Sequence, residues 1–256
     1  MAAQREIDKT HLSCEQAEER GFLHRDYIAH CLRWSHVVKH LQNKYKTARI
    51  LDIGCGKETP LIKTLYTMRM APYSYVGIDM NKLPWQPIHE KISEKMCQQF
   101  ELRGQTDFSL KEQQAPEYDD DFTLITCFEV LEHVTPEKVL GIINNIKLVS
   151  NKDTICFIST PCFNGKAAAN HINEMTYEFM WDLMREHFVV EEHWGTFASQ
   201  RDIEPKIFTN DLEGAYLEHA YTSLKKYYDS NLLSVLFAPL FPQQSRNCMW
   251  KLTTKI

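Results

Sequence analysis

Ile50-Leu51-Asp52-Ile53-Gly54-Cys55-Gly56 is the stretch that decides which fold this chain is expected to adopt. A short apolar run ends in a carboxylate and passes at once into a glycine-containing turn. This is how a buried parallel strand leads into a helix beside a nucleotide-like ligand. Glycine at positions 54 and 56 lets the backbone turn tightly and approach the ligand closely. We therefore predict a strand over residues 48–53 with a ligand at its carboxyl end, and Asp52 facing the positive part of that ligand.

A second strand, predicted over residues 73–79, also ends in a carboxylate. Its last residue, Asp79, lies 25 positions beyond Gly54, close to the separation at which an acidic residue meets the ribose hydroxyls in dinucleotide-type folds. Two strands that each end in aspartate, with a glycine turn between them, favour a ligand that carries a ribose.

Strand-like and helix-like patterns alternate from residue 48 to residue 192. Helices are predicted over residues 60–70, 88–99 and 176–187 and from Pro136 onward, and further strands over residues 100–102, 122–128, 154–159, 188–192 and 248–252. This alternation implies parallel strands covered on both faces. The expected fold class is therefore α/β, a doubly wound and mostly parallel seven-stranded sheet, with residues 248–252 as an edge strand.

One domain is expected over residues 1–256, because no internal repeat or linker interrupts the chain. Residues 1–46 are predicted to form a helical cap, residues 47–198 the core, and residues 199–256 a helical insertion followed by the last strand. One long or two shorter helices are predicted over residues 210–240. An insertion of this length is too long for a turn. A lid over the ligand crevice is the favoured interpretation, and extra core packing or a dimer interface are the alternatives.

The composition is ordinary for a globular protein, with 43% hydrophobic residues and a formal net charge of -5. The negative charge argues against a nonspecific nucleic-acid binder. No run approaches the roughly 18 apolar residues of a membrane span, so no membrane contact is expected. None of the eight cysteines forms a C-x-x-C pair, which predicts reduced, mostly buried thiols in a cytoplasmic protein and no zinc site.

Four motifs together resemble those of the class I S-adenosylmethionine-dependent methyltransferases. They are Leu51-Asp52-Ile53-Gly54-Cys55-Gly56, Asp79, Asp107-Phe108 and Phe128-Glu129-Val130-Leu131-Glu132-His133-Val134. The resemblance covers residues 48–195. Its most specific part is the first motif combined with the last, which a dinucleotide-binding dehydrogenase would not be expected to carry. It implies a Rossmann-like methyltransferase fold, S-adenosylmethionine (SAM) as the cofactor, and methyl transfer as the reaction.

The resemblance also implies which residues bind the methionine part of the cofactor. The turn formed by Gly54, Cys55 and Gly56, with Asp52 below it, would hold that part.

The remaining cofactor contacts are implied in the same way. Asp79, followed by Met80, would accept hydrogen bonds from both ribose hydroxyls. Asp107 would meet the adenine amino group, Phe108 would border the adenine ring, and Phe128 would close the far side near the sulfonium.

Two histidines are candidates for acid–base work. The methyl group of the cofactor is already activated by the positive sulfur, so the protein must chiefly align the acceptor and exclude water. A general base is needed only when the acceptor atom is protonated at the start, as in a hydroxyl or a thiol. His133 and His171 are expected near the carboxyl ends of the strands. For each of them a purely structural role is an equally good interpretation.

The same histidines belong to a metal-binding hypothesis. Glu129, Glu132 and His133 form E-x-x-E-H, and His171 follows later in the chain. This set is similar to that of the small-RNA 3′-end 2′-O-methyltransferases, in which two glutamates and two histidines hold a divalent ion. Such ligands suit a borderline or hard cation that lowers the pKa of a hydroxyl. Against the hypothesis, the same run is common in methyltransferases that bind no metal.

Three functions therefore remain open. The favoured one is methyl transfer from SAM to a small-molecule or sugar/nucleotide-type acceptor without a metal. The second is a metal-dependent RNA 2′-O-methyltransferase that uses Glu129, Glu132, His133 and His171, with RNA as its partner. The third is a cofactor-binding protein without activity, suggested by Glu58, which stands where the family commonly has glycine and would narrow the cofactor loop. The acceptor atom and the oligomeric state are left open.

Overall fold

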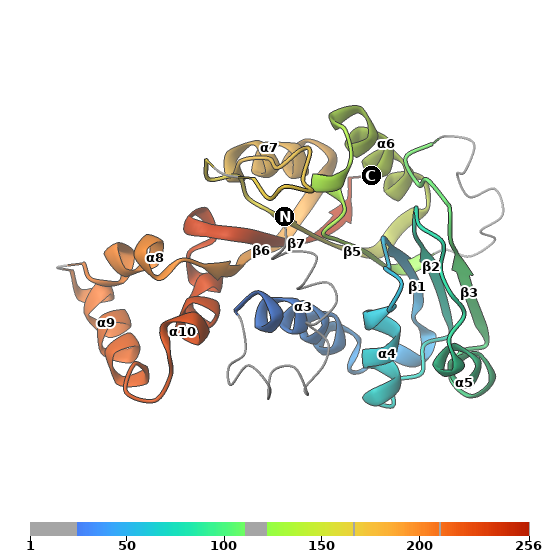
Figure 1. The fold of residues 1–256 in the computed structure, drawn as a ribbon, viewed down its shortest axis with the longest axis horizontal. Helices are drawn as coiled ribbons and strands as arrows, with labels where there is room; N and C mark the ends of the chain where they lie inside the picture. Colours follow the sequence, from blue (N-terminus) through green and yellow to red (C-terminus); the bar gives the residue numbers. More distant parts are fainter. Residues whose placement is uncertain (1–24, 111–121, 166, 210, 256) are drawn as a thin grey trace.

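The computed structural model describes residues 25–110, 122–165, 167–209 and 211–255. Within them a seven-stranded sheet has the order β3-β2-β1-β4-β5-β7-β6 (Figure 1). The strands are β1 (Arg49–Ile53), β2 (Ser74–Ile78), β3 (Gln99–Arg103), β4 (Phe122–Phe128), β5 (Ser150–Pro161), β6 (Phe188–Ala198) and β7 (Ser245–Thr254). Neighbouring strands from β3 to β5 are parallel, which confirms the predicted doubly wound, mostly parallel sheet.

Helices cover both faces of this sheet. They are α3 (Arg25–Leu41), α4 (Pro60–Thr67), α5 (Pro87–Lys95), α6 (Pro136–Leu148), α7 (Tyr177–His187), α8 (Gln200–Ile207), α9 (Leu212–Leu224) and α10 (Ser230–Phe237). Figure 1 shows α3, α4 and α5 on one face and α6 and α7 on the other. The part of the predicted N-terminal helix before Arg25 lies outside the described residues.

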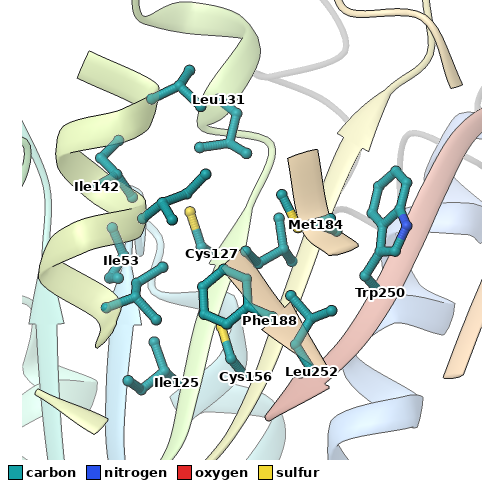
Figure 2. Close-up of a cluster of buried hydrophobic side chains, with 14 of the residues drawn as sticks. Ile53, Ile125, Cys127, Leu131, Ile142, Cys156, Met184, Phe188, Trp250 and Leu252 are labelled. Atoms are coloured by element: carbon teal, nitrogen blue, oxygen red, sulfur yellow. The ribbon is translucent and has the colours of Figure 1, made fainter. Parts of the chain in front are cut away.

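Each face of the sheet has its own hydrophobic core. On the face of α6 and α7, side chains from both helices pack on the central strands, as Figure 2 shows for Ile142, Met184, Ile125 and Trp250. On the opposite face α3 and α4 contribute apolar residues such as Val37 and Leu61 to a second core. Because apolar residues lie on both faces, the central strands are continuous apolar runs, as parallel sheets require.

The prediction of an edge strand at residues 248–252 is wrong. Strand β7 lies between β5 and β6 and is antiparallel to both, so β6 forms the edge. The physical reason is burial on both faces. Cys248, Met249 and Trp250 are successive residues that point to alternate faces, and all three are fully buried.

The insertion between β6 and β7 contains three described helices, where the sequence predicted one or two. Helix α8 was missed because it begins at Gln200, almost directly after β6. The three helices have a small core of their own, which includes Tyr221, Leu233 and Phe237. Helix α10 packs against α3 and β6 (Figure 1). The role of this insertion as a lid stays a prediction.

None of the described helices is both long enough and apolar enough to cross a membrane.

The interior position of β7 makes a testable prediction. Trp250→Ala should lower the free energy of unfolding by about 3–5 kcal/mol, because it leaves a cavity in a packed core. Urea denaturation followed by circular dichroism measures this loss. Val189→Ala on the edge strand β6, where the side chain is 45% exposed, is the control and should cost about 1 kcal/mol or less. Equal losses in the two variants would contradict the interior placement of β7.

Candidate functional site

The turn after β1 is built as the sequence predicted. Gly54 and Gly56 have φ angles of +70° and +68°, a region that glycine occupies without cost. The backbone N–H groups of Gly54 and Cys55 donate to the carbonyl oxygen of Ile78 at 2.8 Å and 3.0 Å. A Cβ at position 54 would lie 2.2 Å from Cγ2 of Val130, whereas one at position 56 would meet no atom within 4 Å. Space beside Gly56 is therefore open to a ligand.

Asp52 lies below this turn and is 2% exposed. Its carboxylate accepts hydrogen bonds from the hydroxyls of Tyr75 on β2 and Thr126 on β4, both at 2.7 Å. Burial raises the pKa of Asp52 to about 6, although these two hydrogen bonds lower it. Asp52 thus ties three strands together beneath the turn, and a direct contact with the cofactor stays a prediction.

Asp79 sits beside the turn at the end of β2. Its Oδ2 accepts a hydrogen bond from the backbone N–H of Gly56 at 3.0 Å, and its Oδ1 accepts from the backbone and side chain of Asn81. These contacts hold the carboxylate next to the open space at Gly56. Met80, the next residue, is 53% exposed. The side chain of Cys55, by contrast, is buried, so only its backbone belongs to the turn.

The residues predicted around the adenine, Asp107 and Phe108, and the one predicted near the sulfonium, Phe128, are largely enclosed. Asp107 accepts hydrogen bonds from Ser109 and pairs with Lys138 at 2.6 Å. Partial burial raises the pKa of Asp107, but these partners outweigh it and bring the pKa below its ordinary value. Phe108 is 3% exposed and packs in the core under α6. Phe128 is 6% exposed, and its ring lies 5.1 Å from that of Trp34 between centroids.

Glu129 begins the second loop of the site, after β4. Its φ angle is +56°, a left-handed conformation that costs a non-glycine residue on the order of 1–3 kcal/mol. The carboxylate accepts hydrogen bonds from the Ser159 hydroxyl at 2.9 Å and from Nδ2 of Asn247 at 2.9 Å and 3.0 Å. It also lies 3.4 Å from the buried guanidinium of Arg33. Glu129 is thus fully engaged with α3, β5 and β7.

Glu132 lies one turn further along, in the short 3-10 helix η3 (Leu131–His133), and is 1% exposed. Its Oε2 accepts a hydrogen bond from the Thr160 hydroxyl at 3.3 Å. Its Oε1 is buried and finds no hydrogen-bond donor among the described residues. Burial and the neighbouring Glu129 carboxylate raise the pKa of Glu132 well above its ordinary value, and Arg33 and Thr160 oppose this. A buried carboxylate oxygen without a donor is a position where a proton, a water molecule or an ion can bind.

His133 and His171 lie against this oxygen. Their rings are 4.8 Å apart between centroids and nearly perpendicular. Nε2 of His133 lies 3.9 Å from Oε1 of Glu132. One ligand atom from each of Glu132, His133 and His171 falls within 4.8 Å of the other two. The structure therefore brings together three of the four residues of the metal hypothesis, while the carboxylate of Glu129 is held by Arg33, Ser159 and Asn247.

The partners of both imidazoles fix which nitrogen carries the proton. Nδ1 of His133 lies 3.1 Å from the backbone carbonyl oxygen of Asn170, and Nδ1 of His171 contacts Oε1 of Glu174. A carbonyl oxygen or a carboxylate only accepts hydrogen bonds, so each Nδ1 is the donor. In the neutral imidazole Nε2 then carries a lone pair. For His133 this nitrogen lies 3.9 Å from Oε1 of Glu132, where it is free to act as an acceptor or as a ligand.

Comparison with known proteins identifies the family. A family model described as a methyltransferase domain matches residues 23–204. The chain belongs to this methyltransferase family. The match covers more than half of the chain and includes both loops of the site.

Individual relatives agree with this family. The chain is 31% identical over 112 residues to a ubiquinone biosynthesis O-methyltransferase of Actinobacillus pleuropneumoniae. These aligned residues cover 44% of this chain and 45% of that protein. The chain thus spans less than half the length of the curated relatives that it matches. A 1,6-didemethyltoxoflavin-N1-methyltransferase of Burkholderia thailandensis, solved with S-adenosylhomocysteine, has a TM-score of 0.54 at 15% identity, covering 89% of this chain and 79% of that one.

A magnesium protoporphyrin IX methyltransferase of Synechocystis, also solved with S-adenosylhomocysteine, has a TM-score of 0.52 at 11% identity. The superposed region covers 90% of this chain and 85% of the Synechocystis enzyme. These solved structures share the fold of the chain, and the family match places the chain among the methyltransferases.

The residues at the first turn fit SAM. The open space beside Gly56, the left-handed glycines and the Asp79 carboxylate form a polar cradle of the kind that a ribose-bearing cofactor needs. Glu58 does not fill this cradle. Its side chain is 57% exposed, and its carboxylate pairs with Lys63 at 2.9 Å. This outward position explains how the methyltransferase accommodates a glutamate there.

Some site residues were not predicted from the sequence. Ser159 and Thr160 end the apolar run of β5 as Asp52 ends that of β1, so the same signal was available for them. Arg33 and Asn247 carried no comparable signal, because their partner Glu129 lies far from both in the sequence.

The close approach at Gly54 makes a prediction for cofactor binding. Gly54→Ala should weaken the binding of S-adenosylhomocysteine, measured by calorimetry, and destabilise the fold. Its Cβ would overlap Val130, and the left-handed backbone adds about 1–2 kcal/mol. Gly56→Ala has the same backbone cost without the overlap, so it should lose less stability. The double variant Gly54→Ala/Val130→Ala should recover part of the loss. Equal destabilisation by the two single variants would argue against the contact.

The raised pKa of Asp52 predicts how stability depends on pH. The folded state binds the Asp52 proton more tightly than the unfolded chain. Wild type therefore loses stability as the pH rises from about 4 through about 6. Asp52→Asn removes this titration. The stability of the variant relative to wild type should rise by at most about 3 kcal/mol between pH 4 and pH 7, measured by urea unfolding. The exposed Asp153→Asn should show no such trend, and a flat difference for Asp52→Asn would contradict the assignment.

Proposed function

We propose that this methyltransferase methylates a hydroxyl group of a small-molecule acceptor, and that Glu132, His133 and His171 hold a divalent cation at the acceptor site. The observation that carries the proposal is the buried Oε1 of Glu132, which accepts no hydrogen bond from any residue that the structure describes. Two imidazoles lie beside the Glu132 carboxylate. Their Nδ1 protons are donated to the Asn170 carbonyl and to Glu174. This departs from the metal-free mechanism favoured by the sequence.

The ligand set suits the cation. One carboxylate and two neutral imidazoles are appropriate for a borderline or hard divalent metal. When bound, such a cation lowers the pKa of a hydroxyl, and SAM supplies an activated methyl group. Thr160 orients the Glu132 carboxylate through its hydroxyl, and the Asn170 carbonyl orients His133. With three protein ligands, positions remain for acceptor oxygens, so an acceptor with two neighbouring hydroxyls fits this site best.

The curated relative supports an oxygen acceptor, because it is named as an O-methyltransferase of ubiquinone biosynthesis. The Burkholderia enzyme is named as an N1-methyltransferase and was solved with 1,6-didemethyltoxoflavin, so it supports a small molecule but not an oxygen acceptor. Both facts concern those proteins, and the first makes a small-molecule hydroxyl the acceptor to test first.

A second candidate acceptor is the 3′-terminal ribose of an RNA, which also presents two neighbouring hydroxyls. Three of the four residues that the resemblance implied for this activity lie together here. The fourth, Glu129, is engaged by Arg33 and Asn247, and the net charge of -5 does not favour RNA. We therefore rank it behind the small-molecule acceptor.

Removal of the cation tests the proposal. Transfer of a labelled methyl group from SAM should fall at least about tenfold in a chelator and recover with Mn²⁺ or Mg²⁺. His171→Ala should abolish the response to added metal while the protein stays folded. His219→Ala, an exposed histidine on α9, is the matched control and should behave as wild type.

The acceptor panel contains catechols, ribonucleosides and a short RNA with either a 2′-hydroxyl or a 2′-deoxy 3′ end. Labelling of the RNA that requires its terminal 2′-hydroxyl would favour the second candidate. Activity that is indifferent both to the chelator and to His171→Ala would overturn the cation proposal.

A further inference from the structure

We propose that Glu174 is a positioning residue that engages Nδ1 of His171, so that His171 keeps its proton on Nδ1 and its Nε2 stays free to bind the proposed cation. This inference rests on the proposed function for its consequence, cation affinity, but not for its geometry. Glu174 follows His171 by three residues in the chain, and the sequence assigned it no role.

The contact between Glu174 and His171 lies away from solvent. The side chains of His171 and Glu174 are 8% and 7% exposed, and Nδ1 of His171 donates a hydrogen bond to Oε1 of Glu174. A carboxylate so far from solvent needs donors. The same Oε1 accepts a second hydrogen bond from the backbone N–H of Ala168 at 2.9 Å. Glu174 therefore meets its requirement through two donors from its own loop.

These contacts make the loop that carries His171 a closed unit. The backbone N–H of His171 donates to the carbonyl oxygen of Ala168 at 3.0 Å. The backbone N–H groups of Ile172 and Asn173 donate to the carbonyl oxygen of Glu132 at 2.9 Å and 3.1 Å. Glu174 closes the loop at one side, and Glu132 anchors it to η3 at the other. In this way His171 reaches His133 from a distant part of the sequence.

The two histidines differ in the charge of their partners. His133 donates to a neutral backbone carbonyl, whereas His171 donates to a carboxylate. A carboxylate partner both selects the tautomer and makes the opposite nitrogen a stronger ligand. Together with Glu132 it supplies two negative charges, which balance those of a divalent cation. His171 is therefore the stronger of the two imidazole ligands, and Glu174 is the reason.

The first experiment reads the tautomer directly. Long-range proton–nitrogen NMR correlations of the full chain, labelled with ¹⁵N-histidine, should show wild-type His171 with the proton on Nδ1. Glu174→Gln keeps an oxygen that accepts this proton and should preserve the tautomer. Glu174→Ala should move the proton to Nε2, which neutral imidazole prefers in water. Glu178→Gln, an exposed glutamate in the first turn of α7, is the control and should leave the spectrum of His171 unchanged.

The second experiment measures affinity for Mn²⁺ by calorimetry on the same proteins. Glu174→Ala should weaken binding by about 10–100-fold. Glu174→Gln should fall between this variant and wild type, because it retains the orientation but not the charge.

The two experiments separate two kinds of failure. If wild type binds no Mn²⁺, the proposed cation is wrong, while the tautomer measurement still decides the role of Glu174. If Glu174→Ala retains the proton on Nδ1 of His171 and binds Mn²⁺ within about twofold of wild type, Glu174 does not position His171. If Glu174→Ala does not fold, the outcome is decided by Glu174→Gln, whose folding is checked from its NMR spectrum.

Discussion

The close approach of Gly54 to Val130 is the constraint on which both halves of the site depend. Strands β1 and β4 are adjacent in the sheet, so the loops that follow them leave the same edge side by side. The first loop carries the cofactor turn and the second carries Glu129, Glu132 and His133. Any side chain at position 54 would enter the space of Val130. A methyl donor and its acceptor must meet within a few ångströms, and this contact sets the separation of the two loops that are proposed to hold them.

Three carboxylates follow from that arrangement, and each has a different electrostatic environment. Asp52 is buried under the first turn and held by two hydroxyls. Glu129 is held by amide, hydroxyl and guanidinium donors. Glu132 is as buried as Asp52, but one of its oxygens has no described donor. Since an uncompensated buried acceptor is costly, the third carboxylate is the one that the proposed cation would compensate.

Sequence patterns predicted the fold well because burial on both faces gives the central strands an unmistakable apolar run. They also placed Gly54, Asp79, Glu132 and His133 at the correct edge of the sheet, since the carboxyl ends of parallel strands coincide there. The patterns failed to predict the position of β7. This strand is buried on both faces and lies next to the edge strand β6, not at the edge itself. They also could not show that Glu129 faces Arg33 and Asn247 or that Glu174 holds His171, because these contacts depend on side-chain direction rather than on spacing.

The order of the strands has a consequence for how the chain folds. Within the described sheet, β6 pairs only with β7, which follows it after the whole α8–α10 insertion. On a growing chain, β6 therefore emerges long before its partner, as an unpaired strand prone to aggregation. The insertion has a core of its own, so it can become compact first and shorten the loop that must be closed. Strand β7 can enter the sheet between β5 and β6 only after the whole insertion has been synthesised.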